Sequence, residues 1–153
     1  MPDNAAWNRP TAFVLAARAV FGLHQAAYRA TGGLIGHRLG PIKCLLLTTR
    51  GGRSGLARTL PLLYGRHGRD LILVASKGGS PKAPAWYLNL QKHPEAVVQV
   101  GSTAIWVKAR TASPAERPRL WKLMNQEYAG YDGYQERTER EIPIVVLEPL
   151  TNA

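Results

Sequence analysis

The sequence predicts one α+β domain with a mainly antiparallel sheet of about six strands, curled into a closed or split barrel with flanking helices. Three observations predict it. The chain has 153 residues, 45% of them hydrophobic and 20% charged, which suits a single globular domain. Short apolar runs follow one another across glycine-containing turns, as in β-hairpins. Strands and helices do not alternate, which argues against a parallel sheet.

The first element that the sequence predicts is a helix over residues 11–31, between Pro10 and Gly32-Gly33. Its polar face carries few cations, and its other face is apolar: Phe13, Ala16, Ala17, Val20, Leu23 and Ala27. Two interpretations stay open. The helix packs against the barrel, or it rests on an anionic membrane surface. We therefore expect an N-terminal helical segment, 1–32, ahead of a barrel over 33–153.

The pattern changes to strands after Pro41. Period-two alternation and buried apolar runs predict strands at 44–49, 57–64, 70–76, 96–100, 103–112 and 144–147. Glycine-containing turns join them at 50–55, 66–69 and 101–102, and residues 77–81 are expected to form a flexible loop.

Two further helices interrupt the strands. One is expected over 84–92, with proline at its start and His93-Pro94 after its end. Another should begin at Pro114 and run to about Tyr128, because Ser113 and Glu116 have the spacing of a capping box. A polar helical piece is predicted to continue to Arg140.

The charge is strongly positive. Twenty Lys and Arg against ten Asp and Glu give a net charge of +10, which attracts nucleic acid, phosphorylated cofactors or an acidic membrane. Cys44 is the only cysteine and lies in an apolar strand, where the thiol is expected to be buried. With no signal peptide and no run of about 20 apolar residues, the sequence predicts a cytoplasmic protein.

The sequence shows no side-chain catalytic constellation. The four histidines are scattered without metal-ligand spacing, so no metal site is predicted. Neither a nucleophile elbow nor a Walker loop is present. If the protein is an enzyme, a bound cofactor is expected to carry the reaction.

Two glycine loops are the candidate anion sites. Gly51-Gly52-Arg53-Ser54-Gly55 precedes Arg58, and Ala75-Ser76-Lys77-Gly78-Gly79 follows a strand. Consecutive glycines let backbone N–H groups converge on an anion, and the cations add charge-assisted hydrogen bonds. Read from spacing alone, both could equally be ordinary turns whose cations point into water.

Aromatic side chains follow the second loop. Trp86 could cover a planar ring or fill the core. Tyr128, Tyr131 and Tyr134 recur every three residues, so a helical turn would place their rings on one side. They could form a lid over the barrel, a wall for an aromatic ligand, or both.

These motifs occur in an order that resembles the deazaflavin-dependent nitroreductase family of actinobacteria. The resemblance covers about residues 10 to 149. It rests on the strands at 45–49 and 58–64 with the glycine turn between them, and on 140–149. Its most specific part is the stretch from Ala75-Ser76-Lys77-Gly78-Gly79 to Pro84-Ala85-Trp86-Tyr87.

The resemblance implies an FMN-binding-like split β-barrel that binds coenzyme F(420), a reduced 8-hydroxy-5-deazaflavin with a phosphodiester and a polyglutamate tail. Arg53, Ser54 and Arg58 would meet the phosphate and tail. The remaining implied coenzyme-binding residues are Thr59, Pro61, Ala75, Ser76, Lys77, Gly78, Pro84, Ala85 and Trp86. Ser76, Tyr128, Tyr131 and Tyr134 would face the substrate and serve in catalysis. Two positions depart from the family pattern: Gly52 stands where a second cation is common, and Leu88 where a His is frequent.

The resemblance also implies the reaction, in which a hydride passes to a quinone or nitroaromatic acceptor. The resemblance further implies contact with the inner face of the membrane through residues 11–31, because some family members associate with membranes through this helix. Two alternatives stay open: the same barrel binding flavin mononucleotide, or a non-catalytic barrel that binds anions or nucleic acid. Nucleic acid is not the expected partner, because the interleaved aromatic and basic strands of such proteins are missing.

Overall fold

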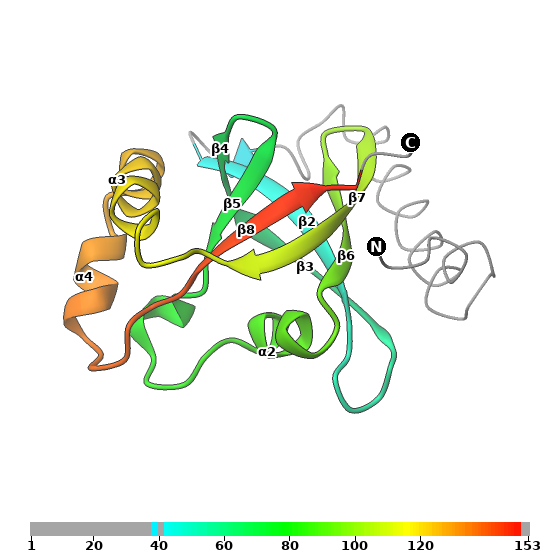
Figure 1. Cartoon of the computed structure of the whole chain (residues 1–153), viewed down its shortest axis with the longest axis horizontal. Coiled ribbons are helices and arrows are strands. Elements are labelled where there is room, and N and C mark those ends of the chain that lie inside the picture. Colours follow the sequence, from blue (N-terminus) through cyan, green and yellow to red (C-terminus); the bar gives the residue numbers. More distant parts are fainter. Residues whose placement is uncertain (1–37, 40–41, 151–153) are drawn as a thin grey trace.

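The computed structural model describes residues 38–39 and 42–150, which form an antiparallel sheet curled around a core, with helices at one side and one end (Figure 1). The predicted N-terminal helix, 11–31, and the whole expected N-terminal segment, 1–32, lie outside the described residues. No helix in the described part is long and apolar enough to cross a membrane.

The described strands are eight: β1 Arg38–Leu39, β2 Ile42–Arg50, β3 Ala57–Leu63, β4 Gly65–His67, β5 Asp70–Val74, β6 Glu95–Val100, β7 Thr103–Thr111 and β8 Ile144–Pro149. Their order is β1-β2-β6-β7-β8-β5-β4. Strand β3 pairs with the edge of β2 that is opposite β6. Every pairing is antiparallel. The helices are α2 Ala85–Lys92, α3 Arg117–Glu127 and α4 Tyr131–Glu136, with a 3₁₀ turn, η2, at Lys77–Gly79.

The antiparallel split barrel is confirmed, and the count of six strands was wrong. The two additional strands are short. β1 has two residues. β4 occupies part of the expected turn at 66–69, because the chain reverses only at Gly68, whose φ of +61° a glycine adopts at little cost.

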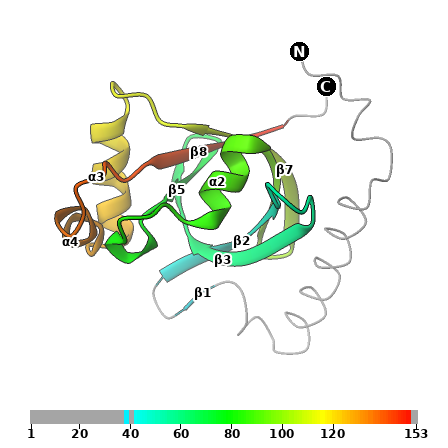
Figure 2. The ribbon, with the colours of Figure 1, turned by 90° about the horizontal axis from the view of Figure 1, so that it is seen from below.

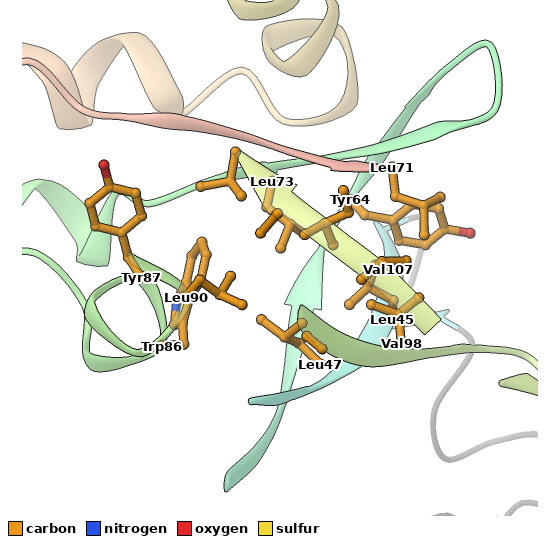
Figure 3. Close-up of a cluster of buried hydrophobic side chains, with 14 of the residues drawn as sticks. Leu45, Leu47, Tyr64, Leu71, Leu73, Trp86, Tyr87, Leu90, Val98 and Val107 are labelled. Atoms are coloured by element: carbon orange, nitrogen blue, oxygen red, sulfur yellow. The ribbon is translucent and has the colours of Figure 1, made fainter. Parts of the chain in front are cut away.

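Strand alternation places one apolar set inside the barrel. Leu45, Leu47, Leu73 and Val98 belong to its main core, together with Trp86 and its neighbours on α2. Figure 3 shows α2 presenting Trp86, Tyr87 and Leu90 toward the leucines of the sheet. The helix therefore closes one end of the barrel, as the view in Figure 2 shows.

A second apolar cluster lies between the sheet and α3 and α4. It joins Ile72, Val74 and Val146 of β5 and β8 to Leu120 and Met124 of α3, with Tyr131 and Ile142. Cys44 is buried, as predicted from its strand.

The expected Ser113–Glu116 pair is hydrogen-bonded, but it lies ahead of α3, whose own N-cap residue, Glu116, makes no side-chain capping bond. The Ser113 hydroxyl donates to Glu116 Oε2 at 2.8 Å and accepts from the Glu116 backbone N–H at 3.4 Å. The Arg117 N–H donates to the Ser113 carbonyl at 3.0 Å, so the helical turn starts near the predicted place although α3 itself begins at Arg117.

The prediction that a helical piece continues to Arg140 was wrong. Helix α4 ends at Glu136. The Gln135 side chain explains the change of course: its Nε2 donates to the Arg140 carbonyl at 2.8 Å, and its Oε1 accepts from the Ile142 N–H at 2.9 Å. These bonds satisfy the backbone of the α4–β8 connection in a non-helical path.

Removing the Ser113 hydroxyl tests this account of the pair. Ser113→Ala should lower the free energy of unfolding by about 1 kcal/mol at neutral pH. The hydrogen bond from Ser113, followed by that from Arg110, also lowers the pKa of Glu116. A carboxylate with a lowered folded-state pKa stabilises the fold above its unfolded pKa, and that contribution is lost as pH falls through the folded value. Urea unfolding should therefore show that the free energies of unfolding of the wild type and Ser113→Ala differ less near pH 3 than at neutral pH. A difference in unfolding free energy that is larger near pH 3 would contradict this account of the Ser113–Glu116 pair.

Candidate functional site

A groove of about 1120 Å³ opens at the end of the barrel that α2 closes. Its walls are the β2–β3 turn, strand β3, the segment from β5 into η2, and one face of α2. Its lining residues are Thr49, Gly51, Gly52, Arg53, Ser54, Arg58, Thr59, Leu60, Leu62, Val74, Ser76, Lys77, Pro84, Ala85, Trp86, Leu88, Asn89 and Lys92. The volume is slightly larger than the roughly 300–1,000 Å³ of most small-molecule sites.

The groove is positively charged and apolar at once. Arg53, Arg58, Lys77 and Lys92 line it, and its lining contains no Asp or Glu. Apolar side chains, including Leu60, Leu62 and Trp86, contribute the rest of the wall. Trp86 is only 6% exposed, so its ring serves the core and the groove together. Such a surface suits a ligand with a planar apolar part and several negative charges.

The first glycine loop is held by side chains of α2. Asn89 Oδ1 accepts from the Gly52 N–H at 3.0 Å, and Asn89 Nδ2 donates to the Thr49 hydroxyl at 3.1 Å. The Lys92 ammonium donates to the Gly52 carbonyl at 2.6 Å. Within the loop, the Gly55 N–H donates to the Gly51 carbonyl at 2.9 Å, with Gly55 at φ +69°. Both peptide groups of Gly52 are therefore fixed from a neighbouring helix.

The second loop has an unusual backbone. Ser76 has right-handed φ and ψ, and Lys77 follows with φ +45°, a left-handed value that non-glycine residues rarely adopt. A right-handed residue followed by a left-handed one makes successive N–H groups converge into an anion-binding nest. Residues 77–81 were expected to be flexible. The structure instead has a short 3₁₀ turn at Lys77–Gly79, held by internal bonds from Gly79 and Ser80 and by a guanidinium described below, while flexibility stays a prediction.

Nine of the twelve residues that the resemblance implies for coenzyme binding line this groove: Arg53, Ser54, Arg58, Thr59, Ser76, Lys77, Pro84, Ala85 and Trp86. Three do not. Pro61 is exposed and lies on the other face of β3 from Leu60 and Leu62, Ala75 is wholly buried in the core, and Gly78 is exposed in η2. Their roles stay predictions.

Two contributors to the groove were missed from the sequence. Asn89 and Lys92 lie on the face of α2 that Ala85 begins, at helical spacing. That spacing was the available signal. In the family pattern a second cation is common at position 52, where this chain has Gly52. Lys92 brings an ammonium group to the Gly52 carbonyl and so places a cation beside that position. Leu88 lines the groove and is half-exposed.

The three tyrosines do gather, although they do not line the groove. Ring centroids lie 5.3 to 6.2 Å apart, and the Tyr128 and Tyr134 hydroxyls share a hydrogen bond of 3.1 Å. Burial raises the pKa of the Tyr131 phenol, and the hydrogen bond to Tyr128, followed by burial, raises that of Tyr134. Both phenols are therefore protonated at neutral pH.

Helix α4 brings Tyr131 and Tyr134 next to the second loop. A Cβ atom at Gly79 would lie 2.7 Å from the Tyr134 carbonyl oxygen, so the two backbones touch where only glycine fits. Asp132 Oδ1 accepts from the Trp121 indole N–H at 2.7 Å and from Asn125 at 3.0 Å, which fixes α4 on α3.

Comparison with known proteins agrees with this geometry. Residues 20–149 match the family model described as F(420)H(2)-dependent quinone reductase. The chain is 44% identical over 129 residues to an F(420)H(2)-dependent quinone reductase of Mycobacterium tuberculosis, covering 82% of this chain and 87% of that protein.

Solved structures agree as well. One described as an F(420)-H(2)-dependent reductase superposes with a TM-score of 0.64 at 39% identity, covering 69% of this chain and 93% of that one. A structure described as a putative pyridoxamine 5′-phosphate oxidase from Listeria innocua superposes with a TM-score of 0.51 at 12% identity. The superposition covers 71% of this chain and 84% of that chain, and it supports a shared fold only.

The Asn89 amide can be tested as the anchor of the first loop. Asn89→Ala leaves the Gly52 N–H and the Thr49 hydroxyl without this partner, so amide hydrogen exchange at Gly52 should accelerate about tenfold or more. Leu88→Ala, on the same helix and groove, is the matched control and should leave that exchange rate unchanged. Equal rates in both variants would show that α2 does not hold the loop.

The contact between η2 and α4 can be tested with two glycines. Gly78 and Gly79 both have positive φ, +64° and +83°, so alanine costs roughly 1–2 kcal/mol at either position. Only at Gly79 would the new Cβ meet the α4 backbone, whereas nothing lies within 4 Å at Gly78. Thermal or urea unfolding should therefore show Gly79→Ala to be less stable than Gly78→Ala by at least about 1 kcal/mol. Equal stability would mean that the two backbones separate freely.

Proposed function

The chain belongs to the F(420)H(2)-dependent quinone reductase family, and we propose that its groove holds the reduced deazaflavin coenzyme F(420) while a quinone-type acceptor takes the hydride. The observation that carries the proposal is the groove's lining: four cations, no carboxylate and a wall of apolar side chains that includes Trp86. This chemistry matches a planar ring joined to a phosphodiester and a chain of glutamates.

The donor set fits the two ends of that coenzyme. Arg53, Ser54 and Arg58, with Lys92 beside them, offer charge-assisted hydrogen bonds to phosphate and carboxylate oxygens. Pro84, Ala85 and Trp86 offer an apolar surface to the ring system. Each charge-assisted bond contributes roughly 1.5–3 kcal/mol, so several together favour tight binding of an anionic ligand over a neutral one.

The bound coenzyme supplies the hydride, and the chain's own residues position the reactants. The Ser76 hydroxyl, half-buried in the groove wall, has no hydrogen-bond partner among the described residues and is available to the ligand. Because Tyr128 and Tyr134 share one hydrogen bond, one of the two phenolic protons remains available to a neighbouring oxygen. Quinone reduction needs a proton as well as a hydride, and Ser76, Tyr128, Tyr131 and Tyr134 remain the proposed catalytic set.

We place the acceptor at the η2 end of the groove, where α4 packs against the second loop. This placement is supported by the close approach of Gly79 to Tyr134 and by the tyrosine rings behind it. Nitroaromatic compounds are a finer extension of the proposal, since a flat, weakly polar acceptor of that kind suits a position between the groove and the tyrosine rings. Membrane contact through residues 11–31 stays a prediction.

Titration with oxidised coenzyme F(420) tests the cofactor assignment. Tryptophan fluorescence should be quenched to saturation in the wild type, chiefly through Trp86 in the groove wall. Lys77→Ala should weaken binding about tenfold, because it removes one groove cation. Lys122→Ala, which removes an exposed charge from α3, is the matched control and should bind as the wild type does. The rate of menadione reduction by the reduced coenzyme, at subsaturating coenzyme, should likewise be lower in Lys77→Ala than in the wild type and in Lys122→Ala.

Three outcomes would overturn the proposal. Saturable binding of flavin mononucleotide without binding of the deazaflavin would favour the flavin alternative. Tight, salt-sensitive binding to random DNA, with no coenzyme binding, would favour the non-catalytic alternative. Equal losses in Lys77→Ala and Lys122→Ala would show that overall charge, not the groove, attracts the ligand.

A further inference from the structure

Arg140 lies behind the second loop and binds its backbone. The guanidinium donates from Nη2 to the carbonyls of Ala75 at 3.2 Å and Ser76 at 2.9 Å, and from Nε to the carbonyl of Ser80 at 2.8 Å. Arg140 is 60 to 65 residues away from these partners in sequence and is not part of the groove lining. One side chain thus ties both ends of the loop.

These bonds determine where the loop's donors point. In a trans peptide the carbonyl and the following N–H point in opposite directions. Because the Ala75 and Ser76 carbonyls point to Arg140, the N–H groups of Ser76 and Lys77 point away from it. Ser76 and Lys77 both line the groove, and neither N–H has a hydrogen-bond partner among the described residues.

The loop's conformation needs such a restraint. Lys77 has φ +45° and is followed by Gly78 at +64° and Gly79 at +83°. Left-handed backbone at a residue with a side chain is unfavourable and persists only where the surroundings hold it. The Arg140 backbone is itself held, since its carbonyl accepts from Gln135 Nε2 at the end of α4. The restraint therefore joins the loop to the helix that carries Tyr131 and Tyr134.

We infer that Arg140 is a positioning residue: it holds residues 75–80 so that two backbone N–H groups and the Lys77 ammonium face an anionic group of the ligand. The inference rests on the proposed function for the identity of that ligand. Arg140 does not touch the ligand itself. A lysine at this position keeps the charge but cannot span three carbonyls, because its ammonium is a single point.

The test compares Arg140→Gln and Arg140→Lys with Arg119→Gln, which removes an exposed charge from α3. All are measured at a temperature at which circular dichroism shows each variant fully folded. Arg140→Gln should weaken binding of oxidised coenzyme F(420) about tenfold or more, Arg140→Lys less, and Arg119→Gln not at all. The coenzyme KM should rise accordingly, with a smaller change in kcat.

A double-mutant cycle shows whether Arg140 acts through the loop. If it does, Arg140→Gln should cost much less coenzyme affinity in a Lys77→Ala background than in the wild type. Equal costs in both backgrounds would overturn the inference. So would unchanged coenzyme affinity in Arg140→Gln when the wild type binds the coenzyme.

Hydrogen exchange provides a readout that needs no ligand. The Gly79 and Ser80 N–H groups donate within the loop, to the carbonyls of Ser76 and Lys77. Both should exchange faster in Arg140→Gln and keep wild-type rates in Arg119→Gln. If the loop loosens but the wild type binds no coenzyme, the proposed function fails while the restraint stands. If exchange is unchanged, the restraint itself is refuted.

Discussion

The groove depends on one constraint: two glycine-containing loops must leave backbone N–H groups open to a ligand and still keep one shape. A loop whose donors bonded to one another would be ordered but closed, and a loop without restraint would lose its order. Bonds within each loop, such as Gly55 N–H to the Gly51 carbonyl and Gly79 N–H to the Ser76 carbonyl, supply part of the restraint, and side chains of other elements supply the rest. Asn89 and Lys92 of α2 fix both peptide groups of Gly52, and Arg140 binds three carbonyls of residues 75–80. In the second loop, the Ser76 and Lys77 N–H groups thus remain open on the groove side.

The same helix serves stability and binding. Helix α2 closes the barrel with Trp86, Tyr87 and Leu90, while Asn89 and Lys92 on its other face reach the first loop. The free energy gained by burying these apolar side chains therefore also sets the position of the loop-binding residues. On the far side, α3 and α4 cover the outer face of β5 and β8 and place the tyrosines beside η2. A reductase that relies on positioning needs this shared rigidity.

Local patterns in the sequence predicted much of the fold. The apolar runs in 44–49 and 96–100, the turn glycines and the Ser113–Glu116 pair all report on neighbours close in sequence, and the structure contains each of them. Short β4 was missed because three residues carry too little pattern. The end of α4 was missed because Gln135 redirects the chain through side-chain bonds. The role of Arg140 could not be predicted, since its partners at 75–80 meet it only through the tertiary fold. The family resemblance, not spacing, identified the anion as a deazaflavin.

Amide chemical-shift mapping on adding oxidised coenzyme F(420) tests the central claim most directly. The account predicts saturable shifts concentrated in residues 51–55, 76–79 and 85–92, the two loops and the helix that borders them. The outer face of β6 and β7, around Val97 and Trp106, should remain unperturbed. Shifts centred on that outer face, or a spectrum that responds to flavin mononucleotide and not to the deazaflavin, would contradict the account.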